Sequence, residues 1–139
     1  MDSSDRDKCI NITKKMQSMP LCKIFLHPID PIENRCLDYR EIIKHPMDLE
    51  TVMHRLEINY YQKISDWVSD VELIWHNALV YNVEESFYYL IALDMQMWFR
   101  KEISKISKSS GEEWILNLRK ITDQLKSILN MPPSLSNIS

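Results

Sequence analysis

Glycine is almost absent from this chain: the 139 residues include only Gly111. Phosphate-binding loops and dinucleotide-binding turns need several glycines at fixed spacing, so nucleotide-binding enzymes of those kinds are excluded. Tight β-hairpins also rely on glycine, and the Asn-Gly and Asp-Gly pairs that mark their turns are missing. The scarcity of glycine therefore predicts an all-α fold.

Cysteines are few and show no pairing pattern. Cys9, Cys22 and Cys36 form an odd set without Cys-x-x-Cys spacing, and the four histidines show no His-Glu-x-x-His pattern. Without a secretory signal, such cysteines are typical of reduced thiols. We therefore expect no disulfide framework, no metal site and no cofactor.

Long apolar runs and an excess of positive charge are also missing. No stretch approaches the ~20 apolar residues of a membrane-spanning helix, and the N-terminus lacks the basic and apolar regions of a signal peptide. With 17 basic and 20 acidic residues the net charge is −3, whereas duplex-DNA-binding proteins usually present a basic face. We expect an intracellular protein whose partner is neither a membrane nor a specific nucleic-acid sequence.

The chain does contain apolar residues at helical spacing, within the ordinary composition of one folded domain. The first such segment is 5–19, which Pro20 ends. Its apolar face consists of Cys9, Ile12, Met16 and Met19. A second segment follows Asp48, a good helix N-cap. Its apolar face consists of Leu49, Val52, Met53 and Leu56. Both segments are predicted to be amphipathic helices.

Two more helices are predicted after Ser65 and Ser86, which we expect to be their N-caps. The earlier of the two ends near Tyr81-Asn82 and has Trp67, Val68, Val71, Ile74, Trp75 and Ala78 on its buried side. The later one has Tyr88, Ile91, Ala92, Met95, Trp98 and Phe99. These four segments predict a helical bundle.

The stretch between residues 20 and 47 loses the helical pattern, because Pro20, Pro28, Pro31 and Pro46 interrupt it. Apolar residues remain there, and an apolar connection must pack against something. Connections of this length are uncommon in compact domains and are usually functional. We predict an antiparallel four-helix bundle with one long ordered loop, between its first two helices, and two short connections.

Residues 107–111 form a linker-like stretch, after which Ser110 and Glu113 have capping-box spacing. A fifth helix is predicted there, with Trp114, Leu118, Ile121 and Leu125 on one face. We favour packing of this face onto the bundle over a partner-binding role. The predicted organisation is a bundle over residues 5–107 and a C-terminal helical extension and tail over 108–139.

Three segments carry a recognisable pattern: residues 25–31 (FLHPIDP), 38–49 (DYREIIKHPMDL) and 77–82 (NALVYN). In order and spacing they resemble the bromodomain, the four-helix bundle that binds acetyl-lysine. The resemblance covers roughly residues 8–105. It implies a binding module, not an enzyme, and the chain shows no nucleophile elbow, metal cluster or phosphate loop that would favour catalysis.

The resemblance also implies roles for individual residues. Asn82 would hydrogen-bond the acetyl carbonyl, and Tyr39 would reach the same oxygen through a water molecule. Phe25 would touch the acetyl methyl, Ile29 would line the channel, and Tyr88 would occupy the gatekeeper position. Each of these roles is an expectation carried over from the family.

The chain departs from the family pattern at the rim of the implied pocket. Lys23-Ile24 replaces the common Trp-Pro, and Asn34 and Cys36 occupy positions often filled by leucine. These changes make the rim more polar. Tyr81 and Asn77 match positions that shape the pocket from behind. The implied acetyl-lysine-binding residues are Asn82, Tyr39, Phe25, Ile29, Tyr88, Tyr81, Cys36 and Asn34.

Acetyl-lysine is a neutral amide on a stem of four methylenes, each worth ~0.8 kcal/mol when buried. Its buried carbonyl needs a donor, which an asparagine NH₂ supplies without adding a charge. An unmodified lysine would bring an unpaired ammonium into an apolar slot. Because one side chain fills the site, we expect roughly micromolar or weaker affinity.

Simpler explanations remain open for the same residues. Asn82 is also a common helix C-cap in left-handed geometry, and Tyr39 and Tyr88 fit core aromatics with satisfied hydroxyls. Phe25 and Ile29 could serve only to anchor the loop on the bundle. Cys36 could lie near the site without any role in binding. Nearby acidic residues would attract basic tails. They are Asp30, Glu33, Glu84 and Glu85.

The leading hypothesis is an acetyl-lysine reader of histone tails, located in the nucleus as part of a larger chromatin protein. The alternative is an interaction scaffold of the same fold that does not recognise acetyl-lysine, as Lys23, Asn34 and Cys36 suggest. Binding that depends on acetylation would distinguish the two.

Overall fold

The computed structural model describes residues 1–107, which are helical and contain no strand within that range. The described elements are α1 (Ser3–Ser18), the 3₁₀ helix η1 (Pro20–Phe25), α2 (Tyr39–Ile42), α3 (Leu49–Glu57), α4 (Ile64–Tyr81) and α5 (Phe87–Ser107). The predicted fifth helix with its Trp114 face lies outside the described residues. None of the described helices is long and apolar enough to cross a bilayer.

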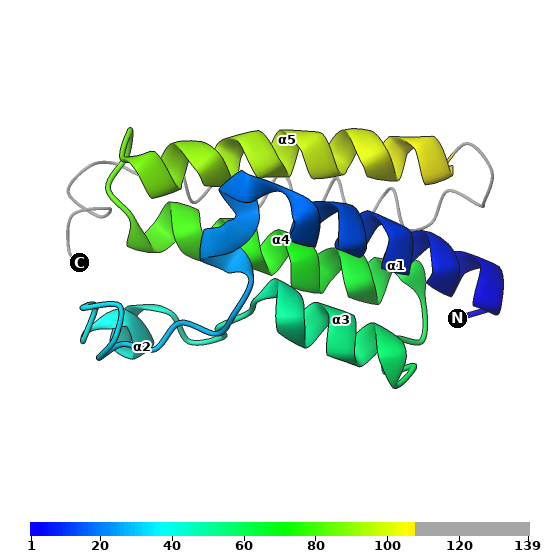
Figure 1. Cartoon of the computed structure of the whole chain (residues 1–139), viewed down its shortest axis with the longest axis horizontal. Helices are drawn as coiled ribbons and strands as arrows, with labels where there is room; N and C mark the ends of the chain where they lie inside the picture. The colour runs from blue at the N-terminus through cyan, green and yellow to red at the C-terminus, as the bar shows by residue number, and fades with distance from the viewer. Residues whose placement is uncertain (108–139) are drawn as a thin grey trace.

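The four longer helices α1, α3, α4 and α5 form a bundle, and α4 contacts each of the other three (Figure 1). The chain runs along α4, reverses at a short link and returns antiparallel along α5. The one-turn helix α2 lies at the end of the bundle where α4 ends and α5 begins. The predicted all-α bundle with a long first loop is confirmed.

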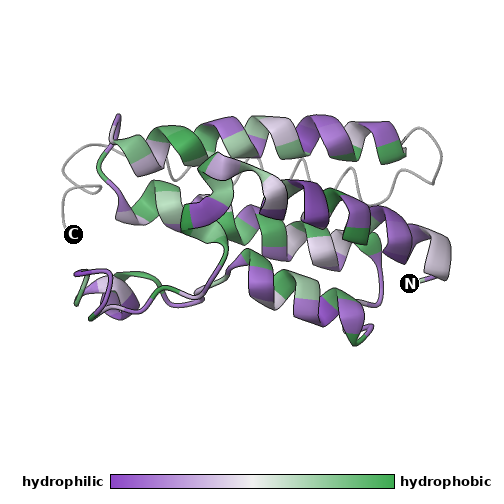
Figure 2. Cartoon of the chain, in the orientation of Figure 1, coloured by the Kyte–Doolittle hydropathy of each residue, from purple (hydrophilic) through white to green (hydrophobic). Residues whose placement is uncertain are grey.

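A single hydrophobic core joins the four helices, with Trp67 and Trp75 of α4 fully buried at its centre. Hydrophobic residues are denser on α4 than on α1, as its central position requires (Figure 2). The Trp67 ring meets Phe99 of α5 edge-on with centroids 5.2 Å apart. The Trp67 indole N–H donates to the Thr13 hydroxyl at 3.2 Å, so this large side chain is buried without an orphaned donor.

The helix starts agree with the sequence in two cases out of three. Asp48 caps α3, accepting from the Thr51 backbone N–H at 2.9 Å. The Ser86 hydroxyl accepts from the backbone N–H of Tyr89 at 3.4 Å, as an N-cap of α5 would. The prediction for Ser65 is wrong: α4 begins at Ile64 without a side-chain cap. Ile64 is itself buried in the core, so tertiary packing sets this start.

The long connection is ordered, and it contains more regular structure than its prolines suggested. Pro20 opens η1 instead of a loop, because a proline at the first position of a helix loses no hydrogen bond. Backbone carbonyls of the connection accept hydrogen bonds from the bundle. The backbone N–H of Glu50 in α3 donates to Leu26 O at 3.0 Å, and Asn77 Nδ2 of α4 donates to His45 O at 2.9 Å.

Candidate ligand-binding site

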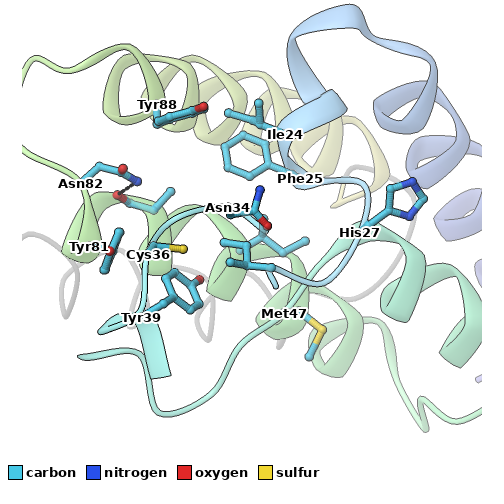
Figure 3. Close-up of a pocket in the computed structure, with 13 residues that line it drawn as sticks. Ile24, Phe25, His27, Asn34, Cys36, Tyr39, Met47, Tyr81, Asn82 and Tyr88 are labelled. Carbon is cyan, nitrogen blue, oxygen red and sulfur yellow. Dashed lines mark hydrogen bonds between the residues drawn. The ribbon is translucent and has the colours of Figure 1, made fainter. Parts of the chain in front are cut away.

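A cavity of about 190 Å³ lies between the long connection, the end of α4 and the start of α5 (Figure 3). Its lining residues are Ile24, Phe25, His27, Ile29, Asn34, Cys36, Tyr39, Met47, Ile74, Ala78, Tyr81, Asn82 and Tyr88. All eight residues that the sequence pattern implied are therefore brought together at one site, from segments far apart in the chain.

Asn82 ends α4 and presents its carboxamide to this cavity. Asn82 is the C-cap residue of α4, as the simpler explanation expected, but its backbone is extended, with φ −87° and ψ 149°, and not left-handed. The side-chain Nδ2 donates to Ala78 O at 2.9 Å, one turn back along α4. A carboxamide nitrogen carries two hydrogens, so one N–H is used to orient the group. The other has no partner among residues 1–107.

Tyr39 lies at the start of α2, with 5% of its surface exposed. Its ring meets Tyr81 edge-on at 4.9 Å between centroids. The hydroxyl points into the cavity (Figure 3) and has no hydrogen-bond partner within the described chain. No described residue therefore satisfies this hydroxyl, which leaves it available to a group in the cavity. Burial raises the pKa of Tyr39 to about 12, so the hydroxyl is neutral at physiological pH.

Tyr81 joins the end of α4 to the start of α2. Its hydroxyl donates to Asp38 Oδ1 at 2.7 Å. This hydrogen bond, aided by burial, raises the pKa of Tyr81 to about 12. Together with the bond from Asn77 to His45 O, it fixes the long connection behind the cavity. Tyr81 and Asn77 therefore support the walls of the cavity from α4.

The apolar side of the cavity is held by the core. The Phe25 ring is buried and packs edge-on against Trp75, with centroids 5.2 Å apart. Phe25 thus serves both as a loop anchor and as a wall. Ile29 and Ile24 continue this apolar side, and Ile24 stands in place of the proline of the common Trp-Pro pair.

The rim of the cavity is polar, as the departures from the family pattern implied. Cys36 is a half-buried free thiol that lines the cavity, so it lies where a ligand could contact it. Burial, and after it the charges of Asp38 and Asp30, raises the pKa of the Cys36 thiol. A raised pKa leaves little thiolate at neutral pH, which makes this thiol a weak nucleophile.

Tyr88 at the start of α5 is 48% exposed and lines the cavity mouth. The alternative that Tyr88 is a core aromatic is therefore wrong. Its periodic position in α5 suggested burial, but the first turn of the helix extends beyond the core. The ring contacts that of the exposed Phe87, with centroids 5.9 Å apart.

Several lining residues were missed by sequence reasoning. His27 was not singled out, yet it lines the cavity and its Nδ1 lies 2.6 Å from a Glu50 carboxylate oxygen. Met47, Ile74 and Ala78 complete the lining, and their position follows from the docking of the loop on α4. The helical spacing of Ile74, Ala78 and Asn82 could have placed all three on one face.

The charged groups near the mouth are solvated. Asp30 and Glu33 in the loop and Glu84 and Glu85 in the link before α5 are all exposed. No described residue that lines the cavity is acidic or permanently basic. Residues 1–107 also contain no group of three or more His, Cys, Asp or Glu side chains that could hold a metal ion.

Comparison with known proteins gives a consistent result. The bromodomain family model matches residues 9–94. The chain is 33% identical over 109 residues to the nucleosome-remodeling factor subunit NURF301 of Drosophila melanogaster, covering 78% of this chain and 4% of that protein. It is 34% identical over 104 residues to transcription factor GTE11 of Arabidopsis thaliana, covering 75% and 17%.

A solved structure gives the same fold. The second bromodomain of Candida albicans Bdf1, bound to an imidazopyridine, superposes with a TM-score of 0.71 at 28% identity. The match covers 73% of this chain and 99% of that one. The chain spans less than a fifth of the length of the two curated relatives above.

Proposed function

Because the chain belongs to the bromodomain family, we propose that it binds acetylated lysine, with the acetyl group in the cavity beside Asn82. Family and fold imply an acetyl-lysine reader, and the residues named below are the roles that we assign. The observation that carries the proposal is the free N–H of Asn82, held at the cavity by the bond to Ala78 O.

The acetyl carbonyl accepts a hydrogen bond from this second N–H of Asn82. The neutral hydroxyl of Tyr39 reaches the same oxygen through a water molecule, since it has no other partner in residues 1–107. The acetyl methyl packs on Phe25, and the methylene stem lies along Ile29 and Ile24. Leaving the carbonyl unbonded would cost about 1–3 kcal/mol, so the donor decides binding.

Selectivity against unmodified lysine follows from what the lining offers. An ammonium group brings three donors and a charge, and no Asp or Glu is among the described lining residues. A buried charge without a partner is strongly unfavourable. Acetylation removes the charge and leaves a carbonyl, which is the group that the Asn82 N–H can bond.

Histone tails are the partners that we propose. Two curated relatives are a nucleosome-remodeling factor subunit and a transcription factor, which supports action in the nucleus within a larger chromatin protein. Asp30 and Glu33 of the long connection and Glu84 and Glu85 of the link before α5 are exposed, and we propose that they attract the lysine- and arginine-rich tails. We propose no enzymatic activity.

Titration of acetylated histone peptides and their unmodified twins, followed by protein NMR, tests the function. We expect shifts at Asn82, Tyr39 and Tyr88 only with the acetylated peptides. Asn82→Ala should weaken acetyl-dependent binding about tenfold or more while the melting temperature changes little. Asn11→Ala, at an exposed position on α1, is the matched control and should bind as the parent does.

Two results would contradict the proposal. Equal shifts from acetylated and unmodified peptides would favour the scaffold alternative, in which the fold is kept and acetyl-lysine is not recognised. Unchanged affinity of the Asn82→Ala variant would reject the role of Asn82 even if acetylated peptides bind.

A further inference from the structure

The segment between Asp30 and Cys36 is locked by its own hydrogen bonds. The Asp30 side-chain oxygen accepts from the backbone N–H of Ile32 at 3.0 Å and of Glu33 at 3.3 Å. The Asn34 backbone N–H donates to Asp30 O at 2.8 Å. The backbone of the segment is therefore held in a fixed arrangement, and two of its side chains, Asn34 and Cys36, line the cavity.

Asn34 completes this lock with its side chain. Its Oδ1 accepts from the Asp30 backbone N–H at 3.0 Å. A backbone N–H can only donate, so the atom that faces it must be the carboxamide oxygen, and the amide nitrogen must lie on the other side. Figure 3 shows this nitrogen on the side of Phe25, across the cavity. Neither of its two N–H groups has a partner in the described part of the chain.

The burial of the three polar residues Tyr39, Asn82 and Asn34 indicates which part of a bound peptide the Asn34 nitrogen would contact. Tyr39 is buried, Asn82 is half-buried and Asn34 is exposed, so the three mark the floor, the wall and the mouth of one cavity. A lysine side chain that reaches Asn82 leaves the main chain of its peptide at the mouth. Every peptide carries carbonyl acceptors there, whatever its sequence.

We propose that Asn34 is a second anchor, whose amide nitrogen donates to a main-chain carbonyl of the peptide next to the acetylated lysine. This inference rests on the proposed function and adds to it: the site would bind the peptide backbone as well as the acetyl group. Because the bond to Asp30 fixes the carboxamide in advance, little side-chain freedom is lost on binding.

Asn34→Asp isolates the donor. The aspartate keeps an oxygen for the Asp30 backbone N–H and removes both N–H groups. Arg35→Gln is the matched control, since it also lowers the loop charge by one at the next, exposed residue and leaves Asn34 in place. Two probes separate the contacts: N-butylacetamide, which is the acetylated side chain alone, and acetyl-lysine capped as an Nα-acetyl methylamide, which adds two main-chain carbonyls.

We expect Asn34→Asp to weaken the capped acetyl-lysine roughly three- to tenfold and to leave N-butylacetamide within about twofold of the parent. Arg35→Gln should change neither. Asn82→Ala should weaken both probes. Unchanged N-butylacetamide binding also shows that the Asn34→Asp cavity is intact.

The outcomes are distinguishable from failure of the proposed function. If neither probe binds the parent protein, or Asn82→Ala weakens neither, the proposed function fails. If the parent binds both probes but Asn34→Asp weakens both equally, Asn34 acts on the side-chain amide or on the loop, and the inference is overturned. It is also overturned if Asn34→Asp weakens neither, or if Arg35→Gln reproduces its effect.

Discussion

The Tyr39 hydroxyl is held in a place where it serves no structural purpose within residues 1–107. Its ring packs on Tyr81 and is 5% exposed, yet its oxygen has no partner in that part of the chain. The Asn82 carboxamide likewise has an N–H without a partner among the described residues, and the exposed Asn34 nitrogen has none there either. All three groups line the cavity and are therefore available to a ligand.

Tyr39→Phe should therefore weaken binding without loss of stability. The phenylalanine keeps the ring contact with Tyr81 and removes only the hydroxyl that would hold the water on the acetyl carbonyl. We expect affinity for N-butylacetamide to fall about three- to tenfold, and the free energy of unfolding at neutral pH to stay within about 0.5 kcal/mol or rise. NMR titration and urea denaturation measure the two quantities.

Alkaline pH supplies an independent check on this variant. Because the folded-state pKa of Tyr39 is about 12, against an ordinary value of 10, folding favours the neutral hydroxyl. The contribution of this hydroxyl to the free energy of unfolding is fully present below pH 10. It is lost as the pH rises from 10 towards 12, because over this range Tyr39 ionises in the unfolded chain before it ionises in the folded protein. Tyr39→Phe lacks this loss, so its stability relative to the parent should rise over that range. If the stability of Tyr39→Phe and of the parent changed equally with pH, the Tyr39 hydroxyl would be exposed to water and its pKa would not be raised by burial.

Residue roles and residue orientations differ in how far sequence predicts them. The eight implied site residues could be named because the chain resembles the bromodomain family in three motifs, and the family's binding positions carry over to them. The orientation of Asn34 could not be predicted, because it depends on one bond from the Asp30 backbone N–H. His27 was missed for a similar reason: its contact with Glu50 joins residues 23 positions apart.

At the scale of elements, α4 and α5 are held together by a buried charge as well as by the core. Glu72 of α4 is 1% exposed, and its two oxygens accept from Arg100 Nε at 3.0 Å and Nη2 at 3.1 Å. Gln96 donates a further, longer bond at 3.4 Å. The Glu72 side chain is 1% exposed in the interface, whereas the Arg100 side chain is 25% exposed. The two partners therefore differ in what their removal leaves behind.

Arg100→Met should destabilise the fold far more than Glu72→Gln. The first change leaves a carboxylate buried without its cation, at a cost of roughly 3 kcal/mol. The second leaves a neutral amide in the interface and an arginine that can turn to solvent, at about 1 kcal/mol. Urea denaturation of both variants gives the comparison.

Lys105→Met is the control for this pair. Lys105 is exposed and pairs with Glu102 at 3.2 Å on the same helix, so its removal should change stability by no more than about 0.5 kcal/mol. Equal losses for Arg100→Met and Glu72→Gln would show that the Glu72 carboxylate is hydrated in solution.

The elements themselves were predictable where the signal is local. The Asp48 cap and the apolar faces of α1, α3 and α4 follow from short-range patterns that tertiary packing reinforces. The start of α4 was misplaced by two residues because burial of Ile64, not a capping side chain, sets it. η1 and α2 were missed because each spans only a few residues, too short for a helical periodicity to show. Their positions depend on contacts with distant elements: η1 contacts α1 and α5, and Tyr39 of α2 packs on Tyr81 of α4.

At the scale of the whole molecule, the cavity is made by laying one long connection across the end of a bundle. The bundle supplies lining residues from α4 and α5, and the connection supplies the rest, among them Phe25, Asn34 and Tyr39. Bonds from Asn77 and Tyr81 of α4 hold that connection in place. The cavity therefore depends on the docking of residues 24–47 on α4 and on the start of α5. All of its lining residues lie between residues 24 and 88.

The predicted domain boundary at residue 107 can be tested on this basis. The buried hydrophobic residues of the described chain extend from Cys9 to Ile106, so a chain ending at residue 107 keeps them all. We expect it to fold and to bind N-butylacetamide within about twofold of the full chain, by NMR and thermal denaturation. If the Trp114 face packs onto the bundle as predicted, only the melting temperature should fall.

A chain ending at residue 97 is the matched control. It removes Phe99 and Ile103, both almost fully buried in the core, together with Arg100, the partner of Glu72. Losing two large core side chains and a buried ion pair costs more than the total stability of a small domain, so this chain should not fold. A chain ending at 107 that also fails to fold, or that binds ten times more weakly, would move the boundary and make residues 108–139 part of the binding domain. The comparison thus separates residues that build the cavity from residues that only support it.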